Sequence, residues 1–276
     1  MEWRDEGILL WVRRHGETNA IIECLTPSNG RHSGLVRGGA SKKYAGMLQA
    51  GAQLSLEWSA RLAEHLGAYK IDLVRGRAAG IMTDRNALAA LNNVSAMLVE
   101  FLPEREPNDR IYEATLGLVD ALEEANPYWP MLYAHWELAL LEVLGFGLDL
   151  TRCAATGQRG ELSYVSPRSG RAVSRRAGAT FADRMLPLPQ FLIEKTKPNI
   201  ADVREAVRTT GFFLEKWVCP AHEVKELPPS RARLLKLMAD MVMEDPSEEE
   251  EIFTEDELKW LAAYEGGQDT EDPAAP

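Results

Sequence analysis

The sequence predicts an α+β protein made of several parts: a small closed β-barrel, then a bundle of helices that is interrupted by a short β insertion. Three observations indicate this organisation. Residues 1–80 contain short apolar runs with a period of two, separated by glycine-rich turns. From Thr83 onward apolar residues recur at helical spacing, and between about residues 150 and 180 that spacing is lost to Gly, Ser and Arg.

The N-terminal part, residues 1–80, is predicted as a barrel from four or five strands. Gly7–Val12 is a compact apolar run, and Ala20–Thr26 is rich in β-branched residues and precedes a Pro-Ser-Asn-Gly turn. Apolar and polar residues alternate in Leu54–Ser59 and again in Tyr69–Leu73, as in half-buried strands. So many short strands in so few residues are typical of an OB-fold.

The second part, residues 81–243, is predicted to be helical. Asp84 is placed to cap a first helix that reaches Leu98, and Asn108 or Asp109 opens a second. Three more amphipathic helices are expected over 128–144, 201–218 and 230–243, and their short connections favour an antiparallel bundle. The stretch 150–180 is predicted as a β-hairpin or ribbon inserted between the helices.

Bulk composition excludes several classes of protein. With 276 residues and 45% hydrophobic content, the chain can build about two domains. It contains no apolar run of about 18 residues that would predict a membrane span, and its charged first residues do not resemble a secretory signal. Three widely spaced cysteines, Cys24, Cys153 and Cys219, favour a reducing compartment, so we expect a cytoplasmic, nucleoid-associated protein.

The net charge of −11 is unevenly distributed. Residues 244–276 hold 13 Asp and Glu and one Lys, which leaves the remaining chain with a net charge of +1. We therefore expect a partly disordered acidic tail over 244–276 and a body with local basic patches. Since screening confines each charge to about 8–10 Å, the local field decides whether a polyanion is attracted.

The stretch Gly30–Lys43, GRHSGLVRGGASKK, is the strongest functional signal. It contains four cations and no acidic residue, and its glycines predict a thin, flexible loop that follows a phosphate backbone closely. A solvated hairpin loop is the competing interpretation. The candidate DNA contacts of the barrel are Arg14, Arg31, Arg37, Lys42, Lys43 and Arg75, with Arg77 as a further cation and Tyr44 as a base-stacking residue. Trp11 and Trp58 are expected to pack in the core.

Two further sets of cations are candidate contacts. A second basic patch in the insertion would bind a polyanion or form only a solvated face; it consists of Arg168, Arg171, Arg175 and Arg176. Cations on the late helices would form the rim of a groove for an acidic, apolar partner tail; they are Arg204, Arg208, Lys216, Arg231 and Arg233. The chain's own segment Glu248–Phe253 resembles such a ligand, although a solubilising tail is the simpler interpretation.

No enzyme or cofactor chemistry is indicated. The sequence has no phosphate-binding glycine motif and no nucleophile–base set, so catalytic residues and cofactors are not expected. Cys219 and His222 have the spacing of half a zinc site, but zinc needs about four ligands and only Cys153 remains as another plausible thiolate. Buried thiols are therefore preferred.

Several segments resemble the RecO family of bacterial recombination mediators. Residues 7–43, GILLWVRRHGETNAIIECLTPSNGRHSGLVRGGASKK, are similar to the family's N-terminal pattern of a G-I-L strand, an E-T turn and a G-x-H-x-G-L-x-x-G-G stretch. Leu48–Gly51, the L-P-E-R-E-P connection at 102–107 and Leu144–Phe146 continue the resemblance. It covers roughly residues 6–243.

The resemblance implies an OB-fold, a helical domain, a zinc-ribbon-like insertion and a non-enzymatic role. Such proteins bind single- and double-stranded DNA, anneal complementary strands, contact the tail of single-strand-binding protein and, with RecR, help to load RecA. Many members carry two C-x-x-C pairs in the insertion. Here only Cys153 remains, with Thr156, Ser174 and Ala177 near the other positions, so we expect no metal. The alternative is an OB-fold adaptor that binds RNA or another protein.

Overall fold

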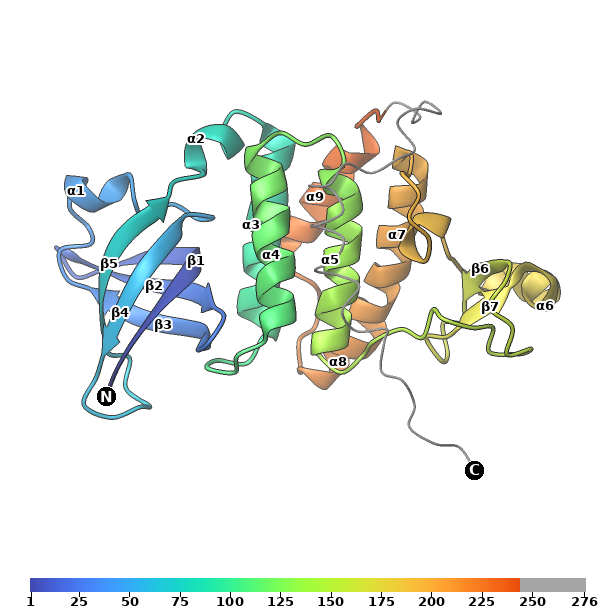
Figure 1. The fold of residues 1–276 in the computed structure, drawn as a ribbon, viewed down its shortest axis with the longest axis horizontal. Coiled ribbons are helices and arrows are strands. Elements are labelled where there is room, and N and C mark those ends of the chain that lie inside the picture. The colour runs from blue at the N-terminus through green and yellow to red at the C-terminus, as the bar shows by residue number, and fades with distance from the viewer. Residues whose placement is uncertain (244–276) are drawn as a thin grey trace. The chain divides into compact units, whose positions relative to one another are not determined.

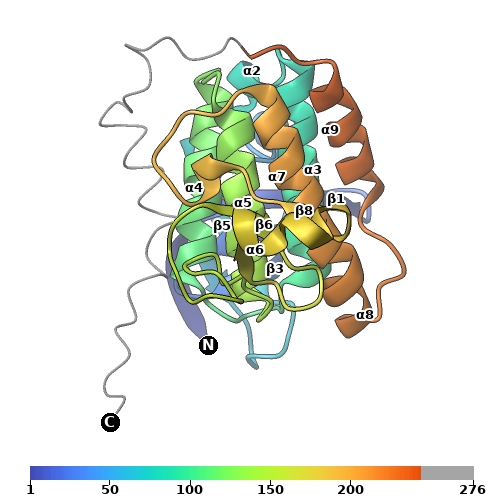
Figure 2. The same ribbon diagram turned by 90° about the vertical axis from the view of Figure 1, so that its right-hand side faces the viewer.

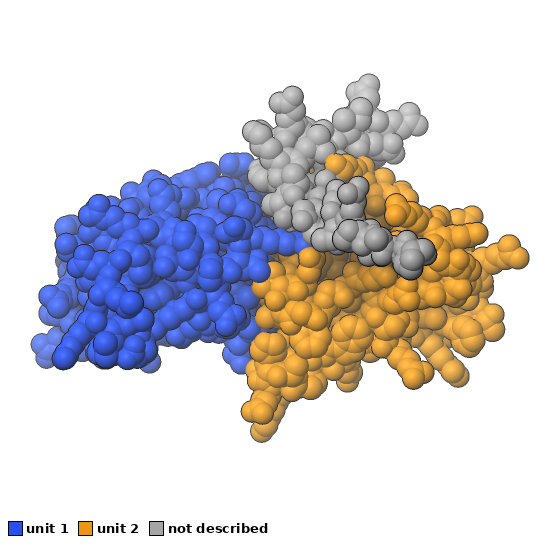
Figure 3. Space-filling model, turned by 60° about the horizontal axis from the view of Figure 1, so that its bottom comes forward, with its two compact units in different colours: residues 1–126, 228–234 blue, residues 127–227, 235–276 orange. Residues whose placement is uncertain are grey.

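A computed structural model describes residues 1–243 of the chain (Figure 1). These residues form two compact units (Figure 3). The first unit consists of residues 1–126 and 228–234, and the second of residues 127–227 with the described residues from 235 onward. The acidic tail at 244–276 lies outside the described residues. No described helix combines the length and apolar character that a membrane crossing requires.

The first unit contains the predicted barrel, which is closed in the strand order β1-β2-β3-β5-β4. All pairs are antiparallel except β3 with β5, which is the arrangement of an OB-fold. The strand bounds are β1 Glu2–His15, β2 Asn19–Thr26, β3 Gly30–Val36, β4 Gln53–Ser59 and β5 Ala68–Arg75. The barrel core is built from inward-facing side chains such as Leu9, Ile22, Leu54, Leu56 and Trp58.

The expected basic loop at Gly30–Lys43 is wrong as a description of the backbone. Residues 30–36 form β3 and residues 42–45 form the short helix α1, Lys42–Ala45. The glycines of this stretch have packing roles: a Cβ on Gly34 would lie 2.3 Å from a ring carbon of Tyr69. Gly34 therefore lets an aromatic ring pack against the strand. In the sequence alone, a glycine at such a position is easily taken as a sign of a loop.

The first unit continues with helices whose starts follow their capping residues. These are α2 Ala78–Ile81, α3 Arg85–Phe101 and α4 Asp109–Glu123. Asp84 accepts a hydrogen bond from the Asn86 amide, and Asn108 accepts one from the Ile111 amide, so both predicted caps are confirmed. Helix α9, Pro229–Ala239, begins in this unit at residues 228–234.

The second unit combines helices with a small sheet. Its elements are α5 Trp129–Val143, β6 Leu162–Val165, β7 Ala172–Ser174, α6 Arg175–Gly178, the 3₁₀ helices η1 Ala179–Arg184 and η2 Gln190–Leu192, β8 Leu186–Pro187, α7 Ile200–Phe213, the π-helix η3 Leu214–Val218 and α8 Cys219–Ala221. Helices α5 and α7 pack against each other, while β7-β6-β8 form the predicted β insertion, which Figure 2 shows beside α6. The insertion lacks cysteine pairs, as expected.

Candidate nucleic-acid interface

One end of the barrel gathers exposed cations from three parts of the chain. The register of β1 with β2 places Arg13 and Arg14 beside Ile21 and Ala20, and Ala20 in turn pairs with Val36 at the end of β3. Arg37 follows directly, and the Gly38 amide donates to the Asn19 side chain at 3.0 Å. We call this region the cationic end; its members are Arg13, Arg14, Arg37, Lys42 and Lys43.

The cationic end has no carboxylate partner among residues 1–243. All five side chains are exposed, and none of the ion pairs found between described residues includes any of them. Arg14 donates only to the Glu17 carbonyl oxygen, at 3.3 Å. Exposed cations without carboxylate partners are the groups that exchange counterions for phosphates. The sequence identified four of the five and missed Arg13.

The aromatic side chains near the cationic end differ from expectation. Trp11 was expected in the core, but it is 36% exposed and the Arg13 guanidinium lies 5.4 Å from its ring centre. Tyr44, the predicted stacking residue, is half-buried against the barrel core, with the Lys43 ammonium 5.4 Å from its ring centre. The signal that was missed is the length of β1: the strand continues to His15 beyond the buried core, so Trp11 and Arg13 project at its exposed end.

Arg31 does not belong to the cationic end, and its contacts do not support the prediction that it binds DNA. Its guanidinium pairs with the Glu23 carboxylate; the Glu23 side chain is buried, and the Arg31 side chain is only 12% exposed. Its Nε donates to the Leu102 carbonyl oxygen at 2.9 Å, and its own carbonyl oxygen accepts from the Arg105 amide at 2.8 Å. These two hydrogen bonds fasten β3 to the 102–107 connection between α3 and α4. Glu23 supplies the carboxylate that a cation of low exposure requires.

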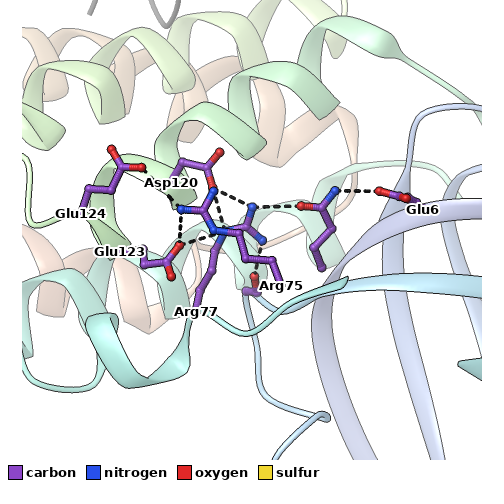
Figure 4. A network of polar contacts seen from close by, with 8 residues as sticks. Glu6, Arg75, Arg77, Asp120, Glu123 and Glu124 are labelled. Atoms are coloured by element: carbon purple, nitrogen blue, oxygen red, sulfur yellow. Dashed lines mark hydrogen bonds and ion pairs between the residues drawn. The ribbon is translucent and has the colours of Figure 1, made fainter. Parts of the chain in front are cut away.

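Arg75 and Arg77 also make internal ion pairs, which do not support the prediction of Arg75 as a DNA contact (Figure 4). Arg75 forms ion pairs with three carboxylates at the end of α4: Asp120 at 3.1 Å, Glu123 at 2.7 Å and Glu124 at 3.4 Å. Arg77 is 1% exposed and pairs with Asp120 at 2.6 Å, while its guanidinium also donates to the barrel residues Gly51 and Gln53. These contacts join the barrel to α4 within the first unit.

The second basic patch keeps three of its four members. Arg168, Arg175 and Arg176 are exposed on the small-sheet region and take part in no ion pair between described residues. Arg171 instead pairs with Asp149 at 3.1 Å, and the strand-like bridge between these two residues holds the start of the insertion against its end. The charge of Arg171 is therefore already paired with a carboxylate of the protein.

The five cations predicted for a partner tail fall in both units. Arg204 donates to the carbonyl oxygens of Met238 and Met241, at 3.0 and 3.1 Å, and so satisfies backbone acceptors at the end of α9. Arg231 is buried. Both are poor candidates for a rim. Arg208 and Lys216 are exposed in the second unit, and Arg233 is exposed in the first.

The residues at the family's usual zinc positions do not fit a zinc ion. Cys153 is fully buried, and its Sγ accepts a hydrogen bond from the Ser174 amide at 3.2 Å and lies 3.4 Å from the Ser174 hydroxyl. One thiol with a serine and a threonine is a weak donor set for zinc. Across the described residues, no three His, Cys, Asp or Glu side chains are grouped as metal ligands. Burial of Leu162 and Val173 shows that packing holds this insertion together.

The barrel and its exposed cations define a class: an OB-type domain with a cluster of exposed cations at one end, followed by a helical domain. Comparison with known proteins supplies the family. The family Recombination protein O N terminal matches residues 1–77, and Recombination protein O C terminal matches residues 82–226. The chain belongs to the recombination protein O, or RecO, family.

Several bacterial relatives match along nearly their whole length. The chain is 52% identical over 239 residues to the DNA repair protein RecO of Cereibacter sphaeroides strain ATCC 17029, which covers 87% of this chain and 99% of that protein. It is 50% identical over 242 residues to the DNA repair protein RecO of Ruegeria sp. strain TM1040, with 88% and 100% covered. The corresponding protein of Jannaschia sp. strain CCS1 is 48% identical over 243 residues, with 88% and 98% covered.

Proposed function

We propose that this protein is a non-enzymatic recombination mediator of the bacterial cytoplasm that binds single- and double-stranded DNA and anneals complementary strands. The observation that supports DNA binding is the cationic end, where five exposed cations have no carboxylate partner among the described residues. Membership of the RecO family supports the role in repair. Contacts to phosphates set affinity without reading sequence, so binding has little base preference.

Annealing follows from charge neutralisation. Two complementary strands repel each other because both are polyanions, and a protein that displaces their counterions lowers this repulsion. No nucleotide hydrolysis is needed for that step. Together with RecR, the protein then helps to load RecA onto DNA coated by single-strand-binding protein.

The remaining cations serve secondary contacts in this proposal. Arg168, Arg175 and Arg176 provide a second polyanion surface on the small-sheet region. Arg208 and Lys216 attract the acidic tail of single-strand-binding protein. Removing the charges of Arg208 and Lys216 should weaken binding of a peptide with that tail's sequence while DNA affinity stays the same. Equal peptide binding by the variant would remove these two residues from the proposal.

A salt series tests the principal claim. Affinity for a fluorescent oligonucleotide should fall with salt with a logarithmic slope of about −3.5 for a single strand if all five cations contact phosphates. The variant Lys42→Glu/Lys43→Glu should bind more weakly, show a slope smaller in magnitude by at least about 1, and anneal more slowly. A matched control, Lys225→Glu/Lys236→Glu, makes the same change of charge at exposed positions in the second unit.

Two kinds of result would contradict this proposal. A flat salt dependence, or equal losses in the Lys42/Lys43 variant and in the control, would contradict the assignment of the cationic end. Stronger binding of RNA than of single-stranded DNA in competition would favour the RNA-binding alternative.

A further inference from the structure

One mouth of the barrel is built from aromatic rings. Trp3 of β1 pairs directly with Trp58 of β4, and their rings stack with centroids 5.8 Å apart. The His32 ring meets both indoles edge-on, at 5.1 and 4.9 Å, and its Nδ1 lies 3.0 Å from the Tyr69 hydroxyl. We call these four residues the aromatic mouth. Trp58, His32 and Tyr69 are buried, whereas Trp3 is only half-buried at the opening.

A hollow of about 380 Å³ opens over the aromatic mouth. Trp3, His32, Trp58, Asn29, Ala63 and Arg105 line it. Ligand pockets in proteins range from about 300 to 1,000 Å³, so this hollow suits one small planar group. The exposed apolar side chains Leu62 and Leu66 lie on the 60–67 segment that borders it. Trp58 Nε1 donates to the Leu66 carbonyl oxygen at 3.0 Å, which holds that segment in place.

Arg105 supplies the hollow with a cation in a strained backbone position. Its φ is +65°, which a residue with a side chain adopts only when the surroundings enforce it. Its guanidinium donates to the Ala63 carbonyl oxygen and to the His65 carbonyl oxygen, the latter at 3.1 Å. Its Nε is buried and has no hydrogen-bond partner among the described residues. The guanidinium group places a positive charge at the lining of the aromatic hollow, which favours a ligand that carries hydrogen-bond acceptors.

A second, more polar hollow of about 220 Å³ adjoins the first, because both are lined by Glu2, Trp3 and Trp58. Arg4 and Lys70 line it, with side chains 80% and 88% exposed, and Glu57 lies between them at 2.7 and 3.9 Å. The two hollows together carry three side-chain cations, including Arg105, against two carboxylates. The smaller hollow by itself has two cations and two carboxylates, so the net positive charge of the pair comes from Arg105 in the larger, aromatic hollow.

We propose that the aromatic mouth binds one unpaired nucleotide of a DNA strand, an inference that rests on the proposed DNA-binding function. The base packs on Trp3 in the larger hollow, where the Arg105 guanidinium donates to a carbonyl oxygen or a ring nitrogen of the base. The adjacent phosphate lies near Arg4 and Lys70 in the smaller hollow. A base in a duplex is stacked on both faces and cannot enter, so this site distinguishes single strands from duplexes. The cationic end does not make that distinction.

Replacement of Trp3 by leucine tests the site while an apolar side chain still covers the core. Trp3→Leu should bind an oligothymidine about tenfold more weakly, because stacking of a base on an aromatic ring contributes about that much to affinity. Its affinity for duplex DNA should stay within about twofold of the wild type. Trp3→Phe should restore most of the loss. The unchanged protein should also bind an oligomer of abasic nucleotides about tenfold more weakly than oligothymidine.

Variants with intact cores keep the test independent of folding. Arg4→Ala/Lys70→Ala changes only exposed side chains and should reduce the salt slope for the single strand but not for the duplex. Equal single-strand affinity in Trp3→Leu and the wild type would overturn the proposal, and so would equal losses on single strand and duplex. The proposal would also be overturned if Trp3→Leu no longer bound RecR but bound oligothymidine as the wild type does. The aromatic mouth would then be a site for a protein partner.

Failure of this site can be told apart from failure of the proposed function. If Lys42→Glu/Lys43→Glu weakens both kinds of DNA while Trp3→Leu changes neither, the cationic end stands and the aromatic mouth does not. If Trp3→Leu alone causes a selective loss on single strands, the mouth stands and the assignment of the cationic end is wrong.

Discussion

The guanidinium of Arg31 pairs with the buried carboxylate of Glu23 on a neighbouring strand of the barrel, and little of the Arg31 side chain is exposed. Of the cations in the predicted basic stretch, Arg31 is thus the one that the protein uses internally. Arg37, Lys42 and Lys43, from the same stretch, are exposed and have no carboxylate partner among the described residues. A stretch that looks uniformly basic therefore divides into one structural cation and three that are available to a ligand.

Breaking the Arg31–Glu23 pair should destabilise the fold without changing DNA affinity. Arg31→Met leaves the Glu23 carboxylate buried without its partner, so we expect the free energy of unfolding to fall by about 3–5 kcal/mol. The double variant Arg31→Met/Glu23→Leu should recover much of that loss, because neither charge remains. Urea denaturation measures both. A double variant that is less stable than Arg31→Met alone would show that the pair is not the cause.

Arg77 and Arg75 should differ strongly in their contributions to stability although both contact Asp120. Arg77 is buried, so Arg77→Met should cost about 3–5 kcal/mol by leaving carboxylates without their cation. Arg75 is 41% exposed, and Arg75→Met should cost at most about 1 kcal/mol. Thermal or chemical unfolding of the two variants side by side checks this difference. Similar losses in both would mean that the network acts as one unit.

Two glycines with the same backbone conformation provide a matched test of close packing. Gly30 and Gly38 have φ values of +63° and +71°. A Cβ at Gly30 would lie 2.2 Å from the Glu106 carbonyl oxygen, whereas a Cβ at Gly38 would meet nothing within 4 Å. Gly38→Ala should therefore cost only the backbone strain, about 1–2 kcal/mol. Gly30→Ala should cost clearly more, and equal midpoints of denaturation would show that the 102–107 connection moves away easily.

Stability should fall as the pH is lowered through the range of two buried histidines. Burial and the nearby Arg105 charge lower the pKa of His32 to about 4, and burial lowers the pKa of His135 to about 4. Both remain neutral in the folded protein, while the unfolded chain binds protons near pH 6.5. The free energy of unfolding is thus largest above about pH 6.5. It falls by up to about 3 kcal/mol per histidine between pH 6.5 and 4. His32→Gln should show a shallower decrease in urea denaturation from pH 7.5 to 4.5.

Removal of metal should leave the protein unchanged. Cys153 is hydrogen-bonded to Ser174 and has no set of zinc ligands around it, so a strong chelator should not shift the thermal unfolding midpoint. Metal analysis of the purified protein provides the direct measurement. A stoichiometric zinc content, or a drop in the midpoint on chelation, would contradict the expected absence of zinc.

The sequence predicted the strands and helix starts well because those signals are local. Alternation at Leu54–Ser59 and the caps Asp84 and Asn108 depend on residues within a few positions of each other. The site was predicted less well, because whether a cation is free depends on distant carboxylates. Asp120, the partner of Arg75 and Arg77, is more than forty residues away along the chain. Likewise, nothing near Trp3 in the sequence indicates that His32, Trp58 and Arg105 surround it.

The path of the chain has a consequence for any attempt to dissect the molecule. Residues 228–234 return to the first unit after the chain has built most of the second. A gene fragment that stops at residue 126 would omit the buried Leu234 and Ser230, whose hydroxyl lies 3.2 Å from Asn93 Oδ1. Such a fragment would lack contacts that the first unit makes in the whole chain, and we expect it to be less stable. Joining residues 1–126 to 228–234 through a short flexible linker is the more faithful way to isolate the barrel.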